Sequence, residues 1–360
     1  MKSALQKAGG ESGGARRDWR LSCFSFLLFF ILLITVRSAA ASSLFDDDSI
    51  LDIELKGPLS SLYKNKNDEV REQRPFTLVA EGVEHDIKVR VRGKSRIEVC
   101  FFPPLRLNFK KGSVAGTVFA GQDKLKLVVH CSLSRYAEPD VLEEYAAYKI
   151  FNELTDISYR VRLLRIRYTD TEGQVKGLEN THYGFIIEPT EQMAERNGGM
   201  VVEKPGVALK WLDPEYSALV YLYQYLIGNT DWSLAPARGE ELCCHNVSLI
   251  EIESRLNPVP YDFDMSGLVN AHYAAPHPNL PRIDRVTQRL YRGYCTDPAI
   301  LRETIHLIQD NRENIVNIIN SLPLLKSSKK EQKIDFLEKA FEATEKEDKL
   351  IRMLENDCIG

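Results

Sequence analysis

The 360-residue sequence lacks any strong excess of charge, because 47 Lys and Arg residues face 51 Asp and Glu residues and the formal net charge is −4. Proteins that bind nucleic acids usually carry a basic face or stripe, so this balance of charges gives no support to a nucleic-acid partner. Beyond its N-terminal region the chain also lacks an apolar run of membrane-spanning length, an internal repeat and a long low-complexity segment. With 44% hydrophobic and 27% charged residues, the composition is that of an ordinary globular protein of one large or two modest domains.

The sequence has no C-x-x-C spacing, which argues against a zinc site. Six cysteines follow the N-terminal segment: Cys100, Cys131, Cys243, Cys244, Cys295 and Cys358. An even number favours disulfides in an oxidising compartment, although six cysteines allow fifteen pairings. We expect Cys100 to pair with Cys131, because both lie in β-like runs. A second disulfide is expected to join Cys295 to Cys243 or Cys244.

The N-terminal segment, residues 1–41, has the order of a secretory signal. Three arginines between positions 16 and 20 precede an apolar run at 23–36 and the small residues at 39–41. We predict a cleaved signal peptide, with an uncleaved N-terminal anchor as the alternative. In either case the rest of the chain is expected outside the cytoplasm, periplasmic or extracellular, and at a membrane only if the segment is uncleaved.

The remaining chain changes character along its length, which predicts an α+β protein. Residues 42–189 alternate apolar and polar positions around one helical segment at 139–154, which predicts a β-rich N-lobe. Residues 190–325 are mainly helical in pattern and form the expected C-lobe. Residues 326–360 read as one charged C-terminal helix with a solvated surface. The default place for a ligand is a cleft between the two lobes.

Three groups of residues carry the candidate chemistry. In chain order they are Lys126 in a strand before the 139–154 helix, Asp231 with Asn246, and Asp262 in the stretch "PYDFDMSG". Phosphoryl transfer needs a cation on the phosphates, an aspartate that orients the attacking hydroxyl, and hard oxygen ligands for Mg²⁺. The order of these residues therefore favours a phosphoryl-transfer site over unrelated turn residues.

The stretches "GNTDWS", "HN" and "PYDFDMSG", which follow "VRVRGKSR" and a strand–helix pair, resemble the CotH-type atypical protein kinases. The resemblance covers about residues 87–267. It implies a two-lobed protein-kinase-like fold with ATP and Mg²⁺ or Mn²⁺ as cofactors. It also implies that Asp231 is the catalytic aspartate and that Asn246 and Asp262 bind the metal.

The other candidate site residues follow from this chemistry. The sequence has no G-x-G-x-x-G loop, so "VRGKSR" is the candidate phosphate cradle. Lys126 is expected to pair with Glu144, although Lys124 and Glu143 are open alternatives. The interval from Asp231 to Asn246 is 15 positions, against five in the ordinary kinase motif, so the intervening insert must fold away. The set of candidates is catalytic Asp231, Lys126 and Glu144, cofactor-binding Arg92, Gly93, Lys94 and Arg96, and metal-binding Asn246, Asp262 and Asp264.

The function expected from the sequence is an exported kinase that transfers the γ-phosphoryl group of ATP to a hydroxyl of a protein or glycan acceptor. A non-catalytic pseudokinase, acting as a cell-envelope binding or adhesion module on the same fold, is the alternative. A hydrolase with Asp231 and Asp262 as an acid/base pair ranks last, because it leaves Asn246 and Lys126 without roles.

Overall fold

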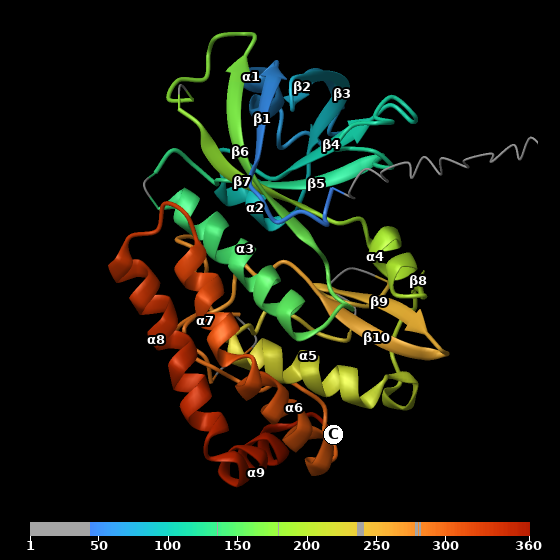
Figure 1. Ribbon diagram of the computed structural model, residues 1–360, viewed down its shortest axis with the longest axis vertical. Coiled ribbons are helices and arrows are strands. Elements are labelled where there is room, and N and C mark those ends of the chain that lie inside the picture. Colours follow the sequence, from blue (N-terminus) through green and yellow to red (C-terminus); the bar gives the residue numbers. More distant parts are fainter. Residues whose placement is uncertain (1–43, 135, 179, 236–240, 278–279, 281) are drawn as a thin grey trace, which may run out of the picture. The chain divides into compact units, whose positions relative to one another are not determined.

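The computed structural model describes residues 44–134, 136–178, 180–235, 241–277, 280 and 282–360 (Figure 1). The expected signal or anchor at 1–41 lies outside these residues. Among the described residues no helix is both long enough and apolar enough to cross a membrane. The chain from Leu44 onward belongs to one compact unit of mixed α+β structure.

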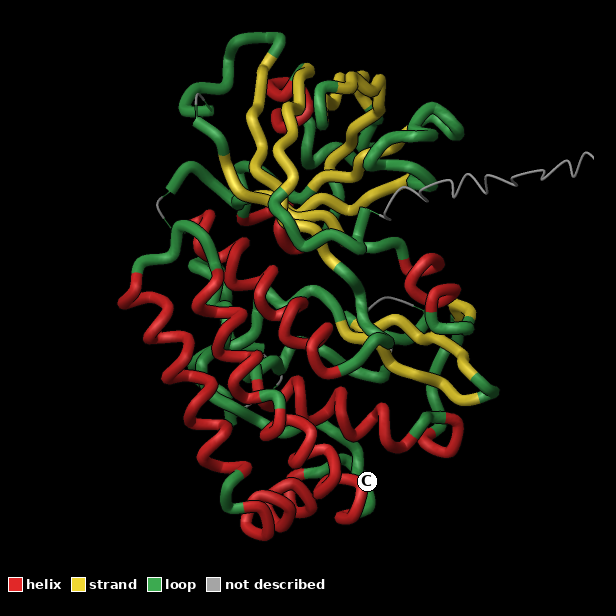
Figure 2. The backbone as a smooth tube through the Cα atoms, viewed as in Figure 1, coloured by secondary structure: helices red, strands yellow, loops and turns green. Residues whose placement is uncertain are grey.

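The β-rich part is a closed barrel, in which the strand order is β1-β2-β3-β4-β5-β7-β6 (Figure 2). Its strands are β1 (Leu51–Gly57), β2 (Arg74–Ala80), β3 (Val83–Val91), β4 (Leu105–Phe109), β5 (Lys124–Val129), β6 (Val161–Asp170) and β7 (His182–Ile187). Neighbouring strands are antiparallel except β1 and β6, which pair in parallel and close the barrel. The alternating sequence pattern predicts these strands, but closure depends on a pairing of strands more than 100 residues apart.

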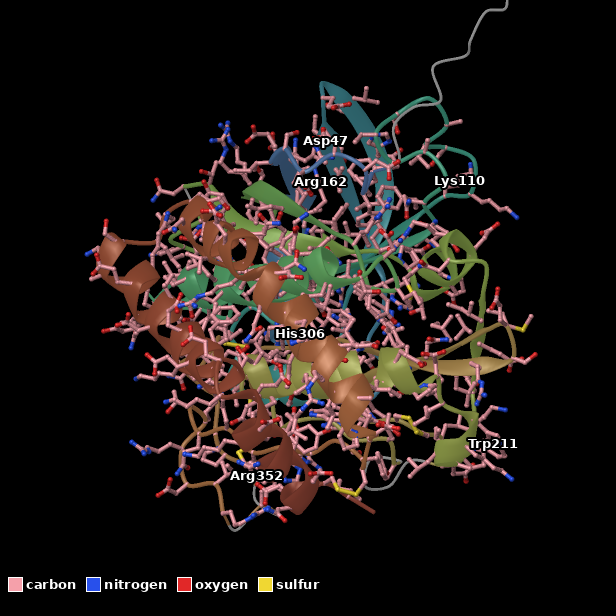
Figure 3. The ribbon with its side chains drawn as sticks, turned by 60° about the horizontal axis from the view of Figure 1, so that its bottom comes forward. Asp47, Lys110, Arg162, Trp211, His306 and Arg352 are labelled. Carbon is pink, nitrogen blue, oxygen red and sulfur yellow. A yellow bond between two sulfur atoms is a disulfide. The ribbon has the colours of Figure 1, made fainter. Side chains whose placement is uncertain are left out.

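Arg162 is one of three basic residues, with Lys149 and Arg160, that bind the segment before β1. Arg162, on β6, is buried and donates hydrogen bonds to the main-chain oxygens of Leu44 and Ser49. Its guanidinium also pairs with the carboxylate of Asp47 at 2.8 Å (Figure 3). Because a buried arginine needs such partners, the start of the described chain is held in one position.

Three helices belong to the β-rich part, and the rest of the chain is mainly helical. The former are α1 (Leu59–Lys64), α2 (Ser95–Val99) and α3 (Ala137–Leu154). The remaining elements are α4 (Thr190–Arg196), β8 (Met200–Val202), a 3₁₀ turn (Leu209–Trp211), α5 (Pro214–Leu226), β9 (Val247–Ile252), β10 (Arg255–Pro260), α6 (Pro298–Asp310), α7 (Arg312–Ser321), α8 (Ser327–Thr344) and α9 (Glu347–Asp357). The charged segment at 326–360 thus forms two helices, α8 and α9, instead of the single helix expected.

Helix α3 connects the two parts. Acidic residues and Pro139 occupy its first turn, where they suit the positive end of the helix dipole and the free N–H groups. Most of its side chains are buried, because it packs against β7 on one side and α7 on the other (Figure 1). On β5, the side chain of Val128 belongs to the same hydrophobic cluster as α3, whereas Leu125 and Leu127 belong to the core of the barrel.

Strand β10 lies at the edge of a small sheet with the order β10-β9-β8, and it contains two prolines. The main-chain N–H of Tyr261 donates to the oxygen of Asn246. Because side-chain direction and hydrogen bonding alternate along a strand, the nitrogens of Pro258 and Pro260 point away from β9. The prolines therefore cost no hydrogen bond with β9.

The cysteine pairs agree with the expectation in part. Cys100 and Cys131 form a disulfide, which confirms that prediction. The prediction for Cys295 is wrong, because it bonds to Cys358 and Cys243 bonds to Cys244. The C-terminus returns beside residues 293–295, where Ile359 exchanges main-chain hydrogen bonds with Gly293 and Cys295, and so brings Cys358 into reach.

Candidate active site

Asp231 lies just beyond the end of α5, in a tight turn. The helix ends before Gly228, whose φ of +64° is a conformation that glycine adopts readily. The buried side chain of Asn229 donates to Gln224 and accepts a hydrogen bond from the N–H of Asp231 at 3.0 Å. The turn therefore fixes the main chain of Asp231 while its side chain stays 24% exposed.

The insert between Asp231 and Asn246 folds back on itself. Ser233 and His245 exchange two main-chain hydrogen bonds of 3.1 Å, so the chain returns to its starting point before Asn246. Residues 236–240 of this insert lie outside the described part of the chain. The bridge explains how 15 positions can separate two side chains that touch.

Asp231 accepts hydrogen bonds from both residues at the end of the insert. The amide nitrogen of Asn246 lies 2.7 Å from the main-chain oxygen of Asp231 and 3.0 Å from its carboxylate. The Nε2 atom of His245 lies 2.9 Å from the other carboxylate oxygen. Burial raises the pKa of Asp231, but the hydrogen bond and charge of His245, with the Asn246 bond, outweigh it and lower the pKa below its ordinary value. The carboxylate is therefore ionised at neutral pH.

The β9–β10 hairpin brings Asp262 to the same place. Strand β9 leaves Asn246, β10 returns opposite it, and the register pairs Val247 with Pro260. Asn246 and Asp262 both have positive φ angles, +53° and +63°, which are uncommon for residues other than glycine and recur at functional sites. The N–H of Asp262 donates to the hydroxyl of Tyr148 on α3, and its side chain is 41% exposed.

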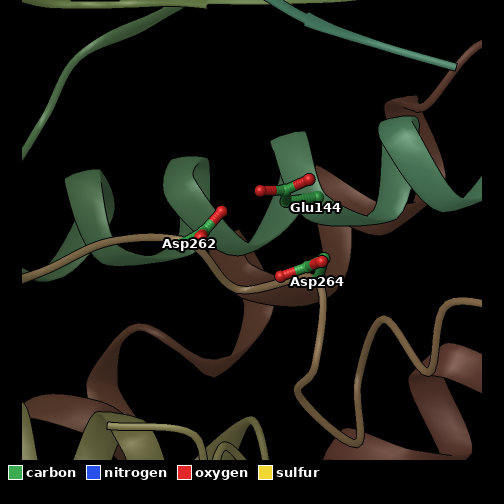
Figure 4. A group of neighbouring side chains, drawn as sticks. All are labelled: Glu144, Asp262 and Asp264. Atoms are coloured by element: carbon green, nitrogen blue, oxygen red, sulfur yellow. The ribbon is translucent and has the colours of Figure 1, made fainter. Parts of the chain in front are cut away.

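Arg96, on α2, lies among three carboxylates that converge from distant parts of the chain. Its guanidinium lies 2.8 Å from Glu144, 3.2 Å from Asp262 and 2.9 Å from Asp264. Figure 4 shows the three acidic side chains, from α3 and from the segment after β10, pointing toward one another. Asp264 also accepts a hydrogen bond from Tyr273. Burial and the neighbouring carboxylates raise the pKa of Glu144 to about 8, against the effect of Arg96.

The expected partner of Glu144, Lys126, is elsewhere. Its ammonium lies 5.1 Å from the centre of the Tyr261 ring and 5.8 Å from that of Tyr159, within the range of cation–π attraction. Among the described residues it forms no ion pair, and Glu144 binds Arg96 instead. Glu143, the alternative glutamate, pairs with Lys333 of α8 at 2.8 Å. The expected lysine–glutamate pair is thus replaced by an arginine–glutamate pair.

The segment expected to cradle phosphates, Arg92 to Arg96, connects β3 to β4 through α2. Gly93 has a φ of +97° and its oxygen accepts a hydrogen bond from Arg71. Arg92 is half-buried, and its charge acts on both Asp262 and Lys126. Arg96 differs from its neighbours, because its guanidinium is buried and already bound by carboxylates.

Asp262 has two groups of neighbours that could complete a metal site: Asn246 on one side, and Glu144 with Asp264 on the other. A divalent metal fits the pair of Asn246 and Asp262 better. Glu144, Asp262 and Asp264 have ligand atoms within 4.8 Å of one another, but the cation of Arg96 lies among them. The amide of Asn246 uses its nitrogen on Asp231, which leaves its oxygen for a metal, and Asp262 is partly exposed. Mg²⁺ in phosphate sites uses one or two protein oxygens besides phosphate and water ligands, so this donor pair suits it.

Sequence reasoning missed the roles of Arg96 and His245. Arg96 lies 48 residues from Glu144 and 168 from Asp264, so no local pattern predicts their contact. The signal for His245 is its position next to Asn246. If Asn246 contacts Asp231, then His245 must lie near that aspartate as well.

Comparisons with known proteins give little further guidance. No protein-family model matches the chain, and no curated protein matches it. Among solved structures, the proinflammatory kinase CtkA of Helicobacter pylori is similar at 11% sequence identity with a TM-score of 0.36, over 70% of this chain and 93% of that one. Nothing about the function of this chain follows from a match of that size.

Proposed function

We propose that this protein is a kinase of the CotH type, which transfers the γ-phosphoryl group of ATP to a hydroxyl of a protein or glycan acceptor. The observation that carries the proposal is the contact of Asn246 with both the main chain and the carboxylate of Asp231. The β9–β10 hairpin brings Asp262 to the same end. A kinase uses an aspartate, an asparagine and a second aspartate in this chain order, for the acceptor proton and for the metal.

The order of elements around the site supports the same proposal. Counted from β3, Lys126 is on the third strand, and α3 with Glu144 follows directly. Kinases carry a phosphate-binding lysine on their third strand and a glutamate on the next helix. We infer a two-lobed protein-kinase-like fold in which β1 and β2 are additions that close the N-lobe sheet into a barrel.

Each residue then has a role in the transfer. The ionised carboxylate of Asp231 orients the acceptor hydroxyl and accepts its proton as the oxygen attacks the γ-phosphorus. Asn246 and Asp262 would hold Mg²⁺ or Mn²⁺, which neutralises charge on the phosphates when bound. Lys126 contacts the α- and β-phosphates. Glu144 acts through Arg96, which holds Asp262 in position.

We also propose that transfer takes place outside the cytoplasm, in the periplasm or beyond. The N-terminal pattern of basic, apolar and small residues supports export, and so does the Cys100–Cys131 disulfide. The acceptor would be an exported protein or glycan.

Labelled-ATP transfer by the chain after residue 42, with an extract of secreted proteins as acceptor, tests the proposal. We expect Asp231→Asn to keep Mg²⁺-dependent ATP binding and lose transfer by at least about a hundredfold. Asp262→Asn should lose the metal-dependent part of ATP binding. Tight Mg–ATP binding that survives Asp262→Asn would exclude this assignment of the metal site.

A second candidate function is a non-catalytic binding module of the cell envelope on the same fold. Arg96 favours it, because this cation already binds Glu144, Asp262 and Asp264 and lies where a metal would compete. This candidate predicts Mg²⁺-independent ligand binding and no transfer. Autophosphorylation of the wild-type protein that disappears in Asp231→Asn would rule it out.

A further inference from the structure

Three cations lie side by side on the outer face of the barrel. The strand register places Arg90 of β3 opposite Arg106 of β4, and Arg106 opposite Lys126 of β5. The residues on either side of them in each strand are buried in the barrel, so these three point outward. Like charges directly opposite one another destabilise a sheet, so this arrangement, here called the cation row, is unfavourable by itself.

No carboxylate within ion-pair distance compensates the cation row among the described residues. The Nε atom of Arg106 is buried and has no hydrogen-bond partner in residues 44–360 as far as the structure describes them. The ammonium of Lys126 lies over the rings of Tyr159 and Tyr261 and makes no ion pair with any residue that the structure describes. Buried donors without partners cost free energy, which an anionic ligand would recover.

The electrostatics of the cation row point the same way. Burial, then the charges of Arg90 and Arg92, lower the pKa of Arg106. Burial, followed by Arg92, lowers the pKa of Lys126 to about 8. Glu191 and Asp123 act in the opposite direction on Arg106, but neither outweighs these effects. An anion on this face would therefore be attracted by every member of the row.

The cation row begins beside the candidate metal site. Lys126 contacts Tyr261, the residue before Asp262, and the charge of Asp262 acts on Lys126. From Lys126 to Arg90 the row crosses two spacings between strands, about 10 Å in all. A row of this length suits several linked phosphates better than a single one.

We propose that Lys126, Arg106 and Arg90 bind the phosphate chain of a nucleoside triphosphate and take the place of the missing glycine-rich loop. The inference rests on the proposed kinase function for the identity of the ligand, but the row itself requires only linked phosphates. Arginine suits this task because its planar donors can bind a phosphate through two hydrogen bonds.

Calorimetric binding of tripolyphosphate, ATP, ADP and AMP without metal, in EDTA, tests the cation row separately from Asp262. We expect affinity to rise with the number of phosphates in the wild-type protein. Arg106→Gln should weaken tripolyphosphate and ATP by about tenfold or more, since it removes charge-assisted hydrogen bonds, and AMP much less. Arg90→Gln serves as the second variant, and unfolding curves establish that each variant is folded.

Lys88→Gln is the matched control, because Lys88 is an exposed cation on the same face of β3, opposite Asn108. It should bind all four ligands as the wild type does. Equal ATP affinity in the wild type and in folded Arg106→Gln and Arg90→Gln would overturn the cation row, even if the protein transfers phosphate. Tripolyphosphate binding that is lost in Arg106→Gln, with no transfer by the wild type, would support the row and contradict the kinase.

Discussion

Arg96 is the residue on which the arrangement of the site depends most. It is buried and binds carboxylates from α3 and from both sides of Phe263. Removing one partner of a buried ion cluster leaves uncompensated charges, which is more costly than the cluster's own net contribution to stability. Arg96 therefore affects stability and site geometry together.

We predict that Arg96→Met lowers the free energy of unfolding by about 3–5 kcal/mol at neutral pH, because the three acidic side chains lose the guanidinium that binds them. Urea denaturation measures this change. The loss should shrink as the pH falls, since protonated carboxyl groups no longer repel one another.

Arg165→Met is the control, because Arg165 forms an exposed pair with Asp52 and such pairs contribute roughly 0–1 kcal/mol. Equal losses of unfolding free energy in the two variants would contradict this role, because Arg96 would then contribute no more to stability than an exposed arginine.

His130 makes the stability of the protein depend on pH. Its imidazole is buried, stacks on His182 at 4.3 Å between ring centres, and has no hydrogen-bond partner at either nitrogen within the part of the chain that the structure describes. Burial, with the charge of His182, lowers its pKa from 6.5 to about 3. Between these two values the unfolded chain binds a proton that the folded chain does not. The free energy of unfolding therefore falls as the pH falls through this range.

The predicted contribution of His130 is at most about 1.4 kcal/mol per pH unit between about pH 6.5 and 3. The free energy of unfolding, measured at pH 7, 6 and 5, should fall less steeply with falling pH in His130→Phe than in the wild type. His306→Phe, at an exposed position on α6, should keep the wild-type slope (Figure 3). Parallel curves for the wild type and His130→Phe would contradict the prediction.

At the scale of elements, the β9–β10 hairpin and the Ser233–His245 bridge create the site. Each turns the chain back on itself, so that residues distant in sequence meet at one place. The cysteine pair Cys295–Cys358 has a similar effect at the end of the chain, where it ties α9 to the segment before α6.

We predict that replacing Cys295 and Cys358 by alanine lowers the free energy of unfolding by about 4 kcal/mol, from the loop entropy of a separation of 63 residues. Chemical denaturation of the oxidised proteins measures it. The Cys100–Cys131 disulfide closes a shorter loop, of 31 residues. Replacing both of its cysteines by alanine should therefore lower the free energy of unfolding slightly less. An unchanged midpoint in the Cys295/Cys358 variant would show that the disulfide does not constrain the unfolded chain.

The sequence allowed most of these elements to be predicted, because alternation and helical spacing are local. It could not predict that β1 pairs with β6, or that Arg96 would replace Lys126 beside Glu144. Both depend on which segments meet in space. Strand β10 was also missed, since Pro258 and Pro260 are unusual in a strand and are accommodated only at a sheet edge.

At the scale of the whole molecule, the C-terminal helices are joined to α3 through a buried lysine. Lys333 of α8 pairs with Glu143 and donates hydrogen bonds to the main-chain oxygens of Leu268 and Val269. The segment expected to be a solvated helix thus contributes to the core beneath the barrel.

We predict that Lys333→Met lowers the free energy of unfolding by about 3–5 kcal/mol, because the buried Glu143 loses the closer of its two lysine partners and keeps only Lys329, at 3.5 Å. Hydrogen exchange should become faster in α8 and α9 before it does in the barrel. Lys339→Met, at an exposed position of the same helix, should change stability by less than about 0.5 kcal/mol. Equal exchange rates in the two variants would contradict this role of Lys333.

The two prolines of β10 have a consequence for how copies of the protein behave at high concentration. An exposed sheet edge offers N–H groups to which a strand of another molecule can add, and this is a route to aggregation. At Pro258 and Pro260 the outward positions of the edge have no N–H to offer. Most of β10 is also buried, so strand addition from a neighbouring molecule is blocked at this edge of the sheet and is left to the opposite edge, β8, where Met200 is exposed.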